Sequence, residues 1–142
     1  MVAPGRGILA ADESTGTIKK RFDKIGIDNV EANRQAYRDM LFNTPDFEKY
    51  TSGVILFEET LFQKSLSGVP FPELLASKGV IPGIKVDQGA KPLFGGGAEE
   101  TITEGLDGLR ERLQKYKAAG ARFAKWRAVI VIGDGTPSDY AI

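Results

Sequence analysis

The sequence contains no cysteine and no histidine. Without cysteine it cannot form disulfides, thiolate metal sites or a thiol nucleophile. Without histidine it cannot build a Ser-His-Asp triad, and a zinc site made of carboxylates alone would be unusual. Any catalysis by these residues must therefore use carboxylates, lysines, hydroxyls or tyrosines.

The sequence also lacks an excess of charge, because 19 Lys and Arg residues balance 19 Asp and Glu residues. This balance gives no electrostatic reason to expect nucleic acid or an anionic membrane as a partner. No apolar run reaches the roughly 18 residues that a membrane-spanning helix needs. Residues Met1 to Gly7 lack the apolar core of a secretory signal, so we expect an intracellular, cytoplasmic protein.

What is present is the composition of one globular domain. The chain has 142 residues, 42% of them apolar, which is enough to bury a core. We find no interdomain linker and no internal repeat, so we expect residues 1–142 to form a single domain. The absence of a metal or cofactor motif predicts no cofactor.

Four short apolar runs predict β-strands, and helical patterns lie between them. The predicted strands are Gly7 to Ala11, Gly53 to Phe57, Gly83 to Val86 and Phe123 to Ile132. Alternation of strand and helix is typical of parallel α/β folds.

The clearest predicted helix runs from Glu100 to Ala119. Thr101 and Glu104 have the spacing of a capping box, and Gly120 predicts the end of the helix. Apolar residues recur at spacings of 4, 3, 4 and 3 on one helical face: Ile102, Leu106, Leu109, Leu113 and Tyr116.

A second helix is predicted from Val30 to Phe42, with Asp28 or Asn29 as its cap and Tyr37, Met40 and Leu41 facing inward. Shorter helices are predicted after Thr17 and around Pro72 to Ser77. The segments 43–46, 68–70 and 95–97 are predicted to be loops or turns.

Length distinguishes two architectures for these elements. A (β/α)8 barrel takes about 250 residues, or about 31 per unit, so this chain would hold about four such units. A small doubly wound sheet, complete in itself, is the alternative.

Charged residues at the strand ends favour the barrel. Lys85 and Asp87 alternate onto one face, as do Lys125 and Arg127, and Asp12 follows the first strand. Both faces of parallel strands are normally covered, and an unpaired buried charge costs several kcal/mol. These cations therefore need carboxylate partners such as Asp12, or an anionic ligand. Structural ion pairs would explain each cation singly, whereas a functional pocket explains them together.

Five motifs in order resemble the class I fructose-bisphosphate aldolases of the animal and plant type. They are GRGILAADESTG from Gly5, GVILFEETL from Gly53, GIKVD from Gly83, GLDGL from Gly105 and FAKWR from Phe123. The resemblance covers nearly the whole chain. It implies the N-terminal half, about four β/α units, of a (β/α)8 barrel. It also implies reversible, metal-free cleavage of fructose 1,6-bisphosphate through a lysine Schiff base, usually by a homotetramer.

The resemblance also implies roles for individual residues. Asp12 resembles a carboxylate that contacts the substrate hydroxyl near the cleaved bond, and Lys125 resembles a lysine beside the reacting carbons. The implied ligands of substrate phosphate are Lys85 and Arg127, with Ser14, Thr17 and Arg21 nearby. Thr17 stands where many members have serine, which keeps the hydroxyl.

The residues that would complete the chemistry are expected beyond Ile142. They include the Schiff-base lysine and the acid/base glutamates of the next strand. The alternative hypothesis is a non-catalytic half-barrel that acts as a structural, interaction or phosphate-binding module.

Overall fold

The computed structural model describes residues 1–97 and 99–142. Its helices and strands are, in chain order, β1 (Gly7–Ala11), α1 (Thr15–Phe22), the short 3-10 helix η1 (Asp23–Ile25), α2 (Glu31–Phe42), α3 (Phe47–Tyr50), β2 (Thr51–Leu56), α4 (Glu58–Phe62), α5 (Phe71–Ser77), β3 (Ile81–Lys85), β4 (Ala90–Pro92), β5 (Thr101–Thr103), α6 (Leu109–Ala118) and β6 (Phe123–Lys125). Within the described residues, no helix is both long and apolar enough to cross a membrane.

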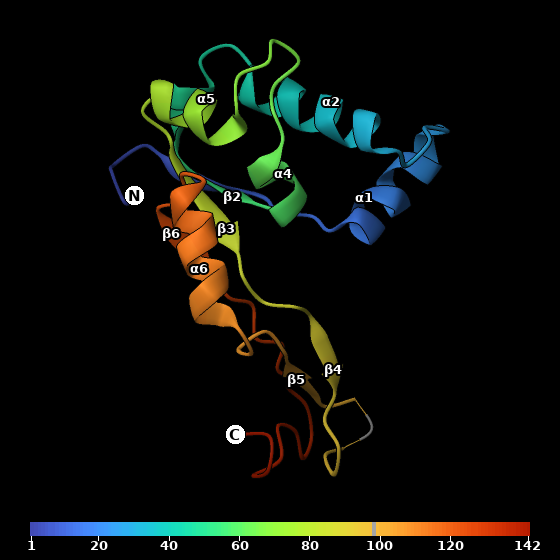
Figure 1. Ribbon diagram of the computed structural model, residues 1–142. Coiled ribbons are helices and arrows are strands. Elements are labelled where there is room, and N and C mark those ends of the chain that lie inside the picture. The colour runs from blue at the N-terminus through green and yellow to red at the C-terminus, as the bar shows by residue number, and fades with distance from the viewer. Residues whose placement is uncertain (98) are drawn as a thin grey trace.

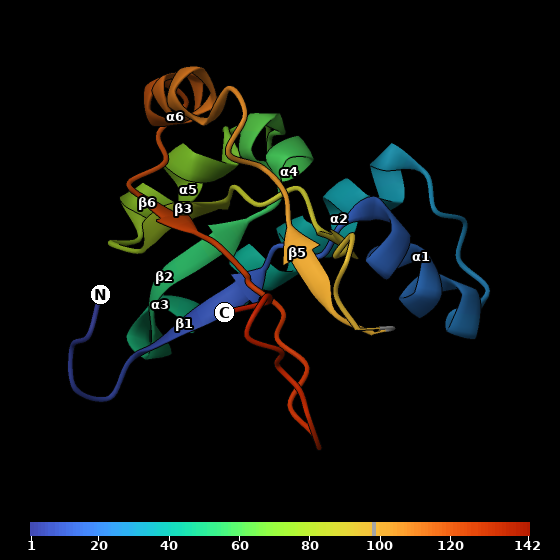
Figure 2. The same cartoon turned by 90° about the horizontal axis from the view of Figure 1, so that it is seen from below.

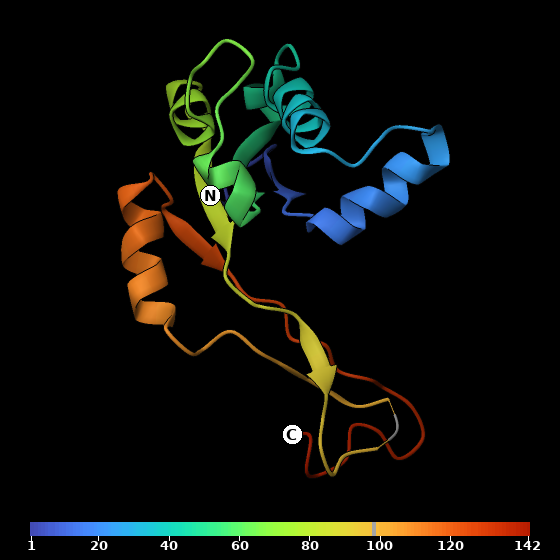
Figure 3. The same cartoon turned by 45° about the vertical axis from the view of Figure 1, so that its right-hand side comes forward.

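Four of the strands form one parallel sheet in the order β1-β2-β3-β6 (Figure 1). Neighbours in the sheet follow one another along the chain, with helices between them, and this confirms the predicted parallel α/β organisation. Helices α2, α4, α5 and α6 gather on one side of the sheet (Figure 2). Strands β4 and β5 form a separate antiparallel pair that projects beyond the carboxyl end of β3 (Figure 3).

The core lies between this sheet and its helices. Phe42 of α2 and Phe71 of α5 are fully buried and meet edge to face, with ring centroids 5.2 Å apart. They pack with Val54 and Leu56 of β2 and with Ile84 of β3. Strand β2 is buried along nearly its whole length, whereas Ile8 of the edge strand β1 is 45% exposed. The central strands are therefore covered and the first strand is only partly so.

The contact between β3 and β6 depends on a glycine. Gly83 and Phe123 are partners in the register, and a Cβ on Gly83 would lie 2.3 Å from the Phe123 ring. Any larger residue at position 83 would displace that ring and open the last strand pair. The glycine that begins the GIKVD motif thus has a packing role.

The last strand is shorter than predicted. The sequence predicts a strand from Phe123 to Ile132, but β6 ends at Lys125. Its neighbour β3 ends at Lys85, so the ladder has no partner for a longer strand. Beyond β6 the chain follows β5, whose Thr101 and Thr103 hydroxyls donate to backbone carbonyls of the segment 127–129.

Nearly the first half of the predicted helix from Glu100 to Ala119 is also wrong. Residues 101–103 form β5, so Thr101 and Glu104 make no capping box, and α6 begins at Leu109. Gly105 and Gly108 have φ values of 130° and 62°, conformations that glycine adopts readily and that interrupt a right-handed helix. The predicted end is confirmed, because α6 ends at Ala118 and Gly120 has a positive φ of 104°.

Helix α2 lies within one residue of its predicted bounds, and Leu41 packs against the core as predicted, but the cap and the position of Met40 differ from the prediction. Val30 precedes the helix without a side-chain cap, and Asn29 instead donates to the Thr15 carbonyl. Arg38 and Phe42 are the buried residues of α2, while Met40 is 59% exposed. The inner face of α2 therefore carries a buried cation, which hydrophobic periodicity does not register.

Candidate functional site

A cavity of about 550 Å³ opens at the carboxyl ends of β1, β3 and β6. Because the strands are parallel, these ends lie at one edge of the sheet. Lys85 and Lys125 are the last residues of β3 and β6, and Asp12 follows β1 directly. The cavity is lined by Asp12, Glu13, Ser14, Thr17, Phe57, Glu58, Lys85, Asp87, Gln88, Gly89, Ala90, Arg112, Tyr116, Lys125, Arg127 and Val129.

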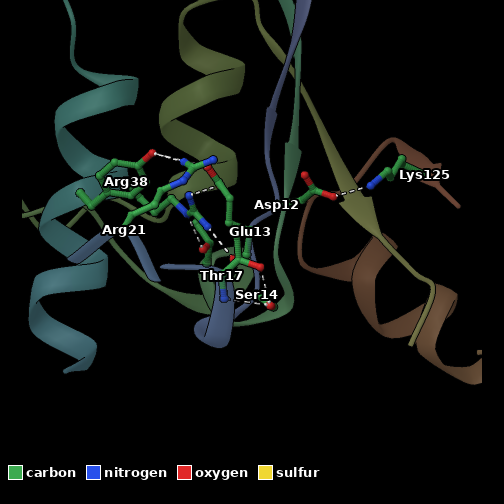
Figure 4. A network of polar contacts seen from close by, with 9 residues as sticks. Asp12, Glu13, Ser14, Thr17, Arg21, Arg38 and Lys125 are labelled. Carbon is green, nitrogen blue, oxygen red and sulfur yellow. Dashed lines mark hydrogen bonds and ion pairs between the residues drawn. The ribbon is translucent and has the colours of Figure 1, made fainter. Parts of the chain in front are cut away.

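An ion pair joins the two edge strands across this cavity. The Lys125 Nζ donates to Asp12 Oδ2 at 2.7 Å, and the two side chains are 27% and 11% exposed (Figure 4). Two strands separate β1 from β6, a backbone distance of about 14 Å in a flat sheet. The side chains can meet because they converge on one concave face. Lys125 thus has the carboxylate partner that its place in a strand requires.

The corner between β1 and α1 holds two hydroxyls at the cavity. Ser14 is the N-cap of α1, and its Oγ accepts from the Thr17 backbone N–H at 3.4 Å. The two hydroxyl oxygens are 3.2 Å apart. Serine is a favoured N-cap because its oxygen satisfies an amide that the helix leaves unpaired. The cap therefore holds both hydroxyls at the cavity that Asp12 also lines.

Glu13 turns away from Asp12 into a cluster of arginines (Figure 4). Its Oε2 accepts from Arg38 Nη1 at 2.6 Å, and its backbone carbonyl accepts from Arg38 Nη2 at 2.9 Å. Its Oε1 accepts from Arg21 Nη1, which also donates to the Tyr37 hydroxyl at 2.9 Å. The Arg38 side chain is only 3% exposed and the Glu13 side chain 11%. This buried pair attaches the β1–α1 corner to α2.

The cluster changes the titration of Glu13. Burial alone would raise the pKa of its carboxyl. A hydrogen bond from its own backbone and the guanidinium groups of Arg38 and Arg21 outweigh burial and lower that pKa below 4.5. Glu13 is therefore ionised at neutral pH and compensates the buried charge of Arg38.

Asp87 forms a second ion pair at the cavity. Its Oδ1 accepts from Lys85 Nζ at 2.7 Å and from the Gly89 N–H at 3.3 Å, and its Oδ2 accepts from the Arg127 N–H at 3.2 Å. Burial opposes ionisation of this carboxyl, but the bond and charge of Lys85 and the two backbone N–H groups lower its pKa below 3.8. Asp87 is thus a stable anion in contact with one cation of the cavity and with the backbone of another.

The structure gathers six of the seven residues that the sequence singles out around one cavity: Asp12, Ser14, Thr17, Lys85, Lys125 and Arg127. Arg21 does not line it; its guanidinium is directed to Glu13 and Tyr37. Sequence reasoning missed Glu13 and Asp87 as site residues. Their position in the sequence was the available signal. Glu13 lies one residue after Asp12 and Asp87 two residues after Lys85, so both follow the end of a strand.

A model of the family described as fructose-bisphosphate aldolase class-I matches residues 1–142. The chain belongs to the class I fructose-bisphosphate aldolase family. The predicted barrel fold is confirmed by a solved aldolase structure from Plasmodium falciparum. That structure is of a complex with TRAP and a small-molecule inhibitor. It matches this chain with a TM-score of 0.94 and 56% sequence identity, and the match covers 99% of this chain and 41% of the Plasmodium chain.

Curated aldolases show the same likeness. A probable class 1 fructose-bisphosphate aldolase of Xanthomonas axonopodis pv. citri is 60% identical over 142 residues, which are 100% of this chain and 42% of that protein. The cytosolic fructose-bisphosphate aldolase 6 of Arabidopsis thaliana is 61% identical over 139 residues, 98% of this chain and 38% of that protein. The chain thus spans about two fifths of the length of these relatives.

Proposed function

We propose that residues 1–142 are the N-terminal part of a glycolytic lyase. The lyase reversibly cleaves fructose 1,6-bisphosphate to dihydroxyacetone phosphate and glyceraldehyde 3-phosphate. The observation that carries this proposal is the meeting of Asp12, Lys125, Lys85 and Arg127 at one cavity. Family membership supports this reaction, and the shared cavity supports the roles proposed for these residues. The similarity to aldolases does not favour a non-catalytic half-barrel.

In the proposed site, Lys85 and Arg127 bind a phosphate group of the substrate, with the Ser14 and Thr17 hydroxyls beside it. A guanidinium offers phosphate a planar fork of donors, and an ammonium offers a compact charge. Arg21 is proposed as an outer phosphate ligand, which would require it to leave Glu13. Its side chain is 53% exposed, so little packing opposes that movement.

Asp12 and Lys125 are proposed to act at the bond that breaks. Asp12 accepts a hydrogen bond from the hydroxyl next to that bond, and the Lys125 ammonium stabilises negative charge on the reacting oxygen. Their ion pair of 2.7 Å holds both groups in place before substrate binds. The amine that forms the Schiff base is proposed to come from outside residues 1–142, because covalent catalysis needs an amine at the substrate carbonyl.

The proposal is tested with the complete protein that carries this sequence. Cleavage of fructose 1,6-bisphosphate is followed through glyceraldehyde 3-phosphate, in the presence and absence of a chelator. Borohydride reduction with dihydroxyacetone phosphate, followed by mass spectrometry, detects the imine. We expect chelator-insensitive cleavage and one trapped adduct per chain. Absence of both would refute the proposed function.

We also propose that the complete protein is a cytoplasmic homotetramer. The cytosolic plant relatives support the compartment. Light scattering on the purified protein measures the number of chains, and a monomer at micromolar concentration would contradict the tetramer.

A further inference from the structure

We propose that Asp87 is a positioning residue for phosphate recognition, which acts by holding Lys85 and the Arg127 backbone in their binding geometry. This inference rests on the proposed function, because Lys85 and Arg127 are there the phosphate ligands. Asp87 itself is an anion, so it acts through its neighbours and not by touching phosphate.

The backbone ladder between β3 and β6 shows why Asp87 is needed. The Val86 N–H donates to the Lys125 carbonyl at 3.0 Å. In a continued parallel ladder the Arg127 N–H would next donate to the Val86 carbonyl. That carbonyl instead accepts from Arg112 Nη1 at 2.9 Å, and the Asp87 carboxylate accepts from Arg127 at 3.2 Å. A side chain thus replaces the backbone acceptor where the two strands separate.

The same carboxylate directs Lys85. The Lys85 ammonium has three N–H donors. One donates to Asp87 Oδ1 at 2.7 Å and one to the Asp87 carbonyl at 2.6 Å. Among the described residues the third has no partner, and Lys85 lines the cavity. Two bonds to one residue fix the ammonium on its flexible stem and leave one donor for a ligand.

Burial indicates that this arrangement is rigid. The Asp87 side chain is 3% exposed and that of Lys85 is 19% exposed. Asp87 also accepts from the N–H of Gly89, where the chain turns toward β4. One carboxylate therefore connects the end of β3, the following turn and the end of β6. A purely structural role for Asp87 would not require one of its partners to be the Lys85 ammonium, which lines the cavity.

The test compares Asp87→Asn and Asp87→Glu in the complete protein. Asn removes the charge and keeps an acceptor, while Glu keeps the charge and moves it by one methylene. We expect both to raise KM for fructose 1,6-bisphosphate about tenfold or more, the usual effect of losing a charged hydrogen bond, with kcat changed less than about threefold. Asp107→Asn is the control, because Asp107 is exposed and lies outside the cavity. A wild-type KM for Asp87→Glu would overturn the proposal.

A double-mutant cycle separates positioning from general destabilisation. Asp87→Asn keeps an acceptor for the Arg127 N–H, so if its effect runs through Lys85 it should change KM less than about threefold in a Lys85→Met background. Full additivity of the two substitutions would overturn the proposal. The Lys85→Met, Asp87→Asn double variant leaves no buried charge without a partner. If Asp87→Asn alone unfolds, comparing the double variant with Lys85→Met still tests the expected small effect.

Calorimetric titration with inorganic phosphate provides a readout that does not depend on cleavage. A wild-type protein without cleavage activity would refute the proposed function, and the cycle could still be measured on phosphate affinity. We expect Asp87→Asn to weaken phosphate binding about tenfold in the wild-type background and little in the Lys85→Met background. Equal phosphate affinity for wild type and Asp87→Asn would overturn the positioning role.

Discussion

Glu13→Gln should destabilise the protein by about 3 kcal/mol. Removing one partner of a buried ion pair costs about 3–5 kcal/mol, because the other charge stays buried without compensation. The Arg38 side chain is 3% exposed, and its other partners are neutral: the Glu13 carbonyl and the Thr60 hydroxyl. These two bonds survive the substitution, which places the expected loss at the lower end of the range.

Urea unfolding measures this loss from the shift of the midpoint at an unchanged m-value. Asp23→Asn is the matched control. It removes the carboxylate of the Lys19–Asp23 pair, whose side chains are 59% and 54% exposed, so the expected change is below about 1 kcal/mol. A loss for Glu13→Gln no larger than that of the control would refute the reasoning that Arg38 depends on Glu13.

The pH dependence provides a second check on the same pair. The folded state holds the Glu13 pKa below its ordinary value of 4.5. The stability that this shift contributes is fully present above the unfolded pKa and is lost as the pH falls through the folded pKa. Below about pH 4.5, wild type should therefore lose stability more steeply than Glu13→Gln. Parallel curves would show that Glu13 has the same pKa in both states.

Three further substitutions or truncations test the site. Arg127→Ala should weaken binding of sugar phosphate to the complete protein by about 1.5–3 kcal/mol, and an unchanged affinity in calorimetry would rule out its role as a ligand. Lys125→Ala should reduce turnover far more than stability, measured on one sample by cleavage assay and thermal unfolding; preserved turnover per folded molecule would make Lys125 a structural residue. A polypeptide of residues 1–142 alone should neither cleave fructose 1,6-bisphosphate nor yield a borohydride-trapped imine, and its open strand edges should make it dimerise or aggregate. An adduct on Lys125 with measurable cleavage would contradict that expectation.

Local sequence patterns predicted those helices and strands whose ends are marked by glycine or by charged residues. Strand β1 matches its prediction to the residue, because Gly5 precedes it, Gly7 begins it and charged residues follow it. The failures have two causes. The helical spacing of apolar residues continued across Gly105 and Gly108, so the helix was predicted to begin too early. The backbone at these two glycines has positive φ and is not helical. The length of β6 depends on a neighbour, since a strand ends where its partner leaves the sheet.

The site was predictable in its cations and less so in its anions. Lysines and arginines in a strand attract notice because burial makes them costly. Glu13 and Asp87 follow their strands, where charged residues are ordinary. Glu13 pairs with Arg38, which is 25 positions away, and Asp87 joins Lys85 to the backbone of Arg127 on another strand. Arg38 was hidden within a helix whose apolar pattern pointed to other residues. Such networks become visible only when the packing of helix on sheet is known.

The bond between Asp12 and Lys125 also bears on the order in which the chain folds. It joins residues 113 positions apart, and closing a loop of that length carries an entropic cost of about 4 kcal/mol beyond a constant. We expect such a contact to form only after the four strands lie side by side, late in folding. Interactions that form after the transition state slow unfolding and leave the folding rate unchanged. A partly folded chain would therefore hold its core and its helices before it holds a complete site.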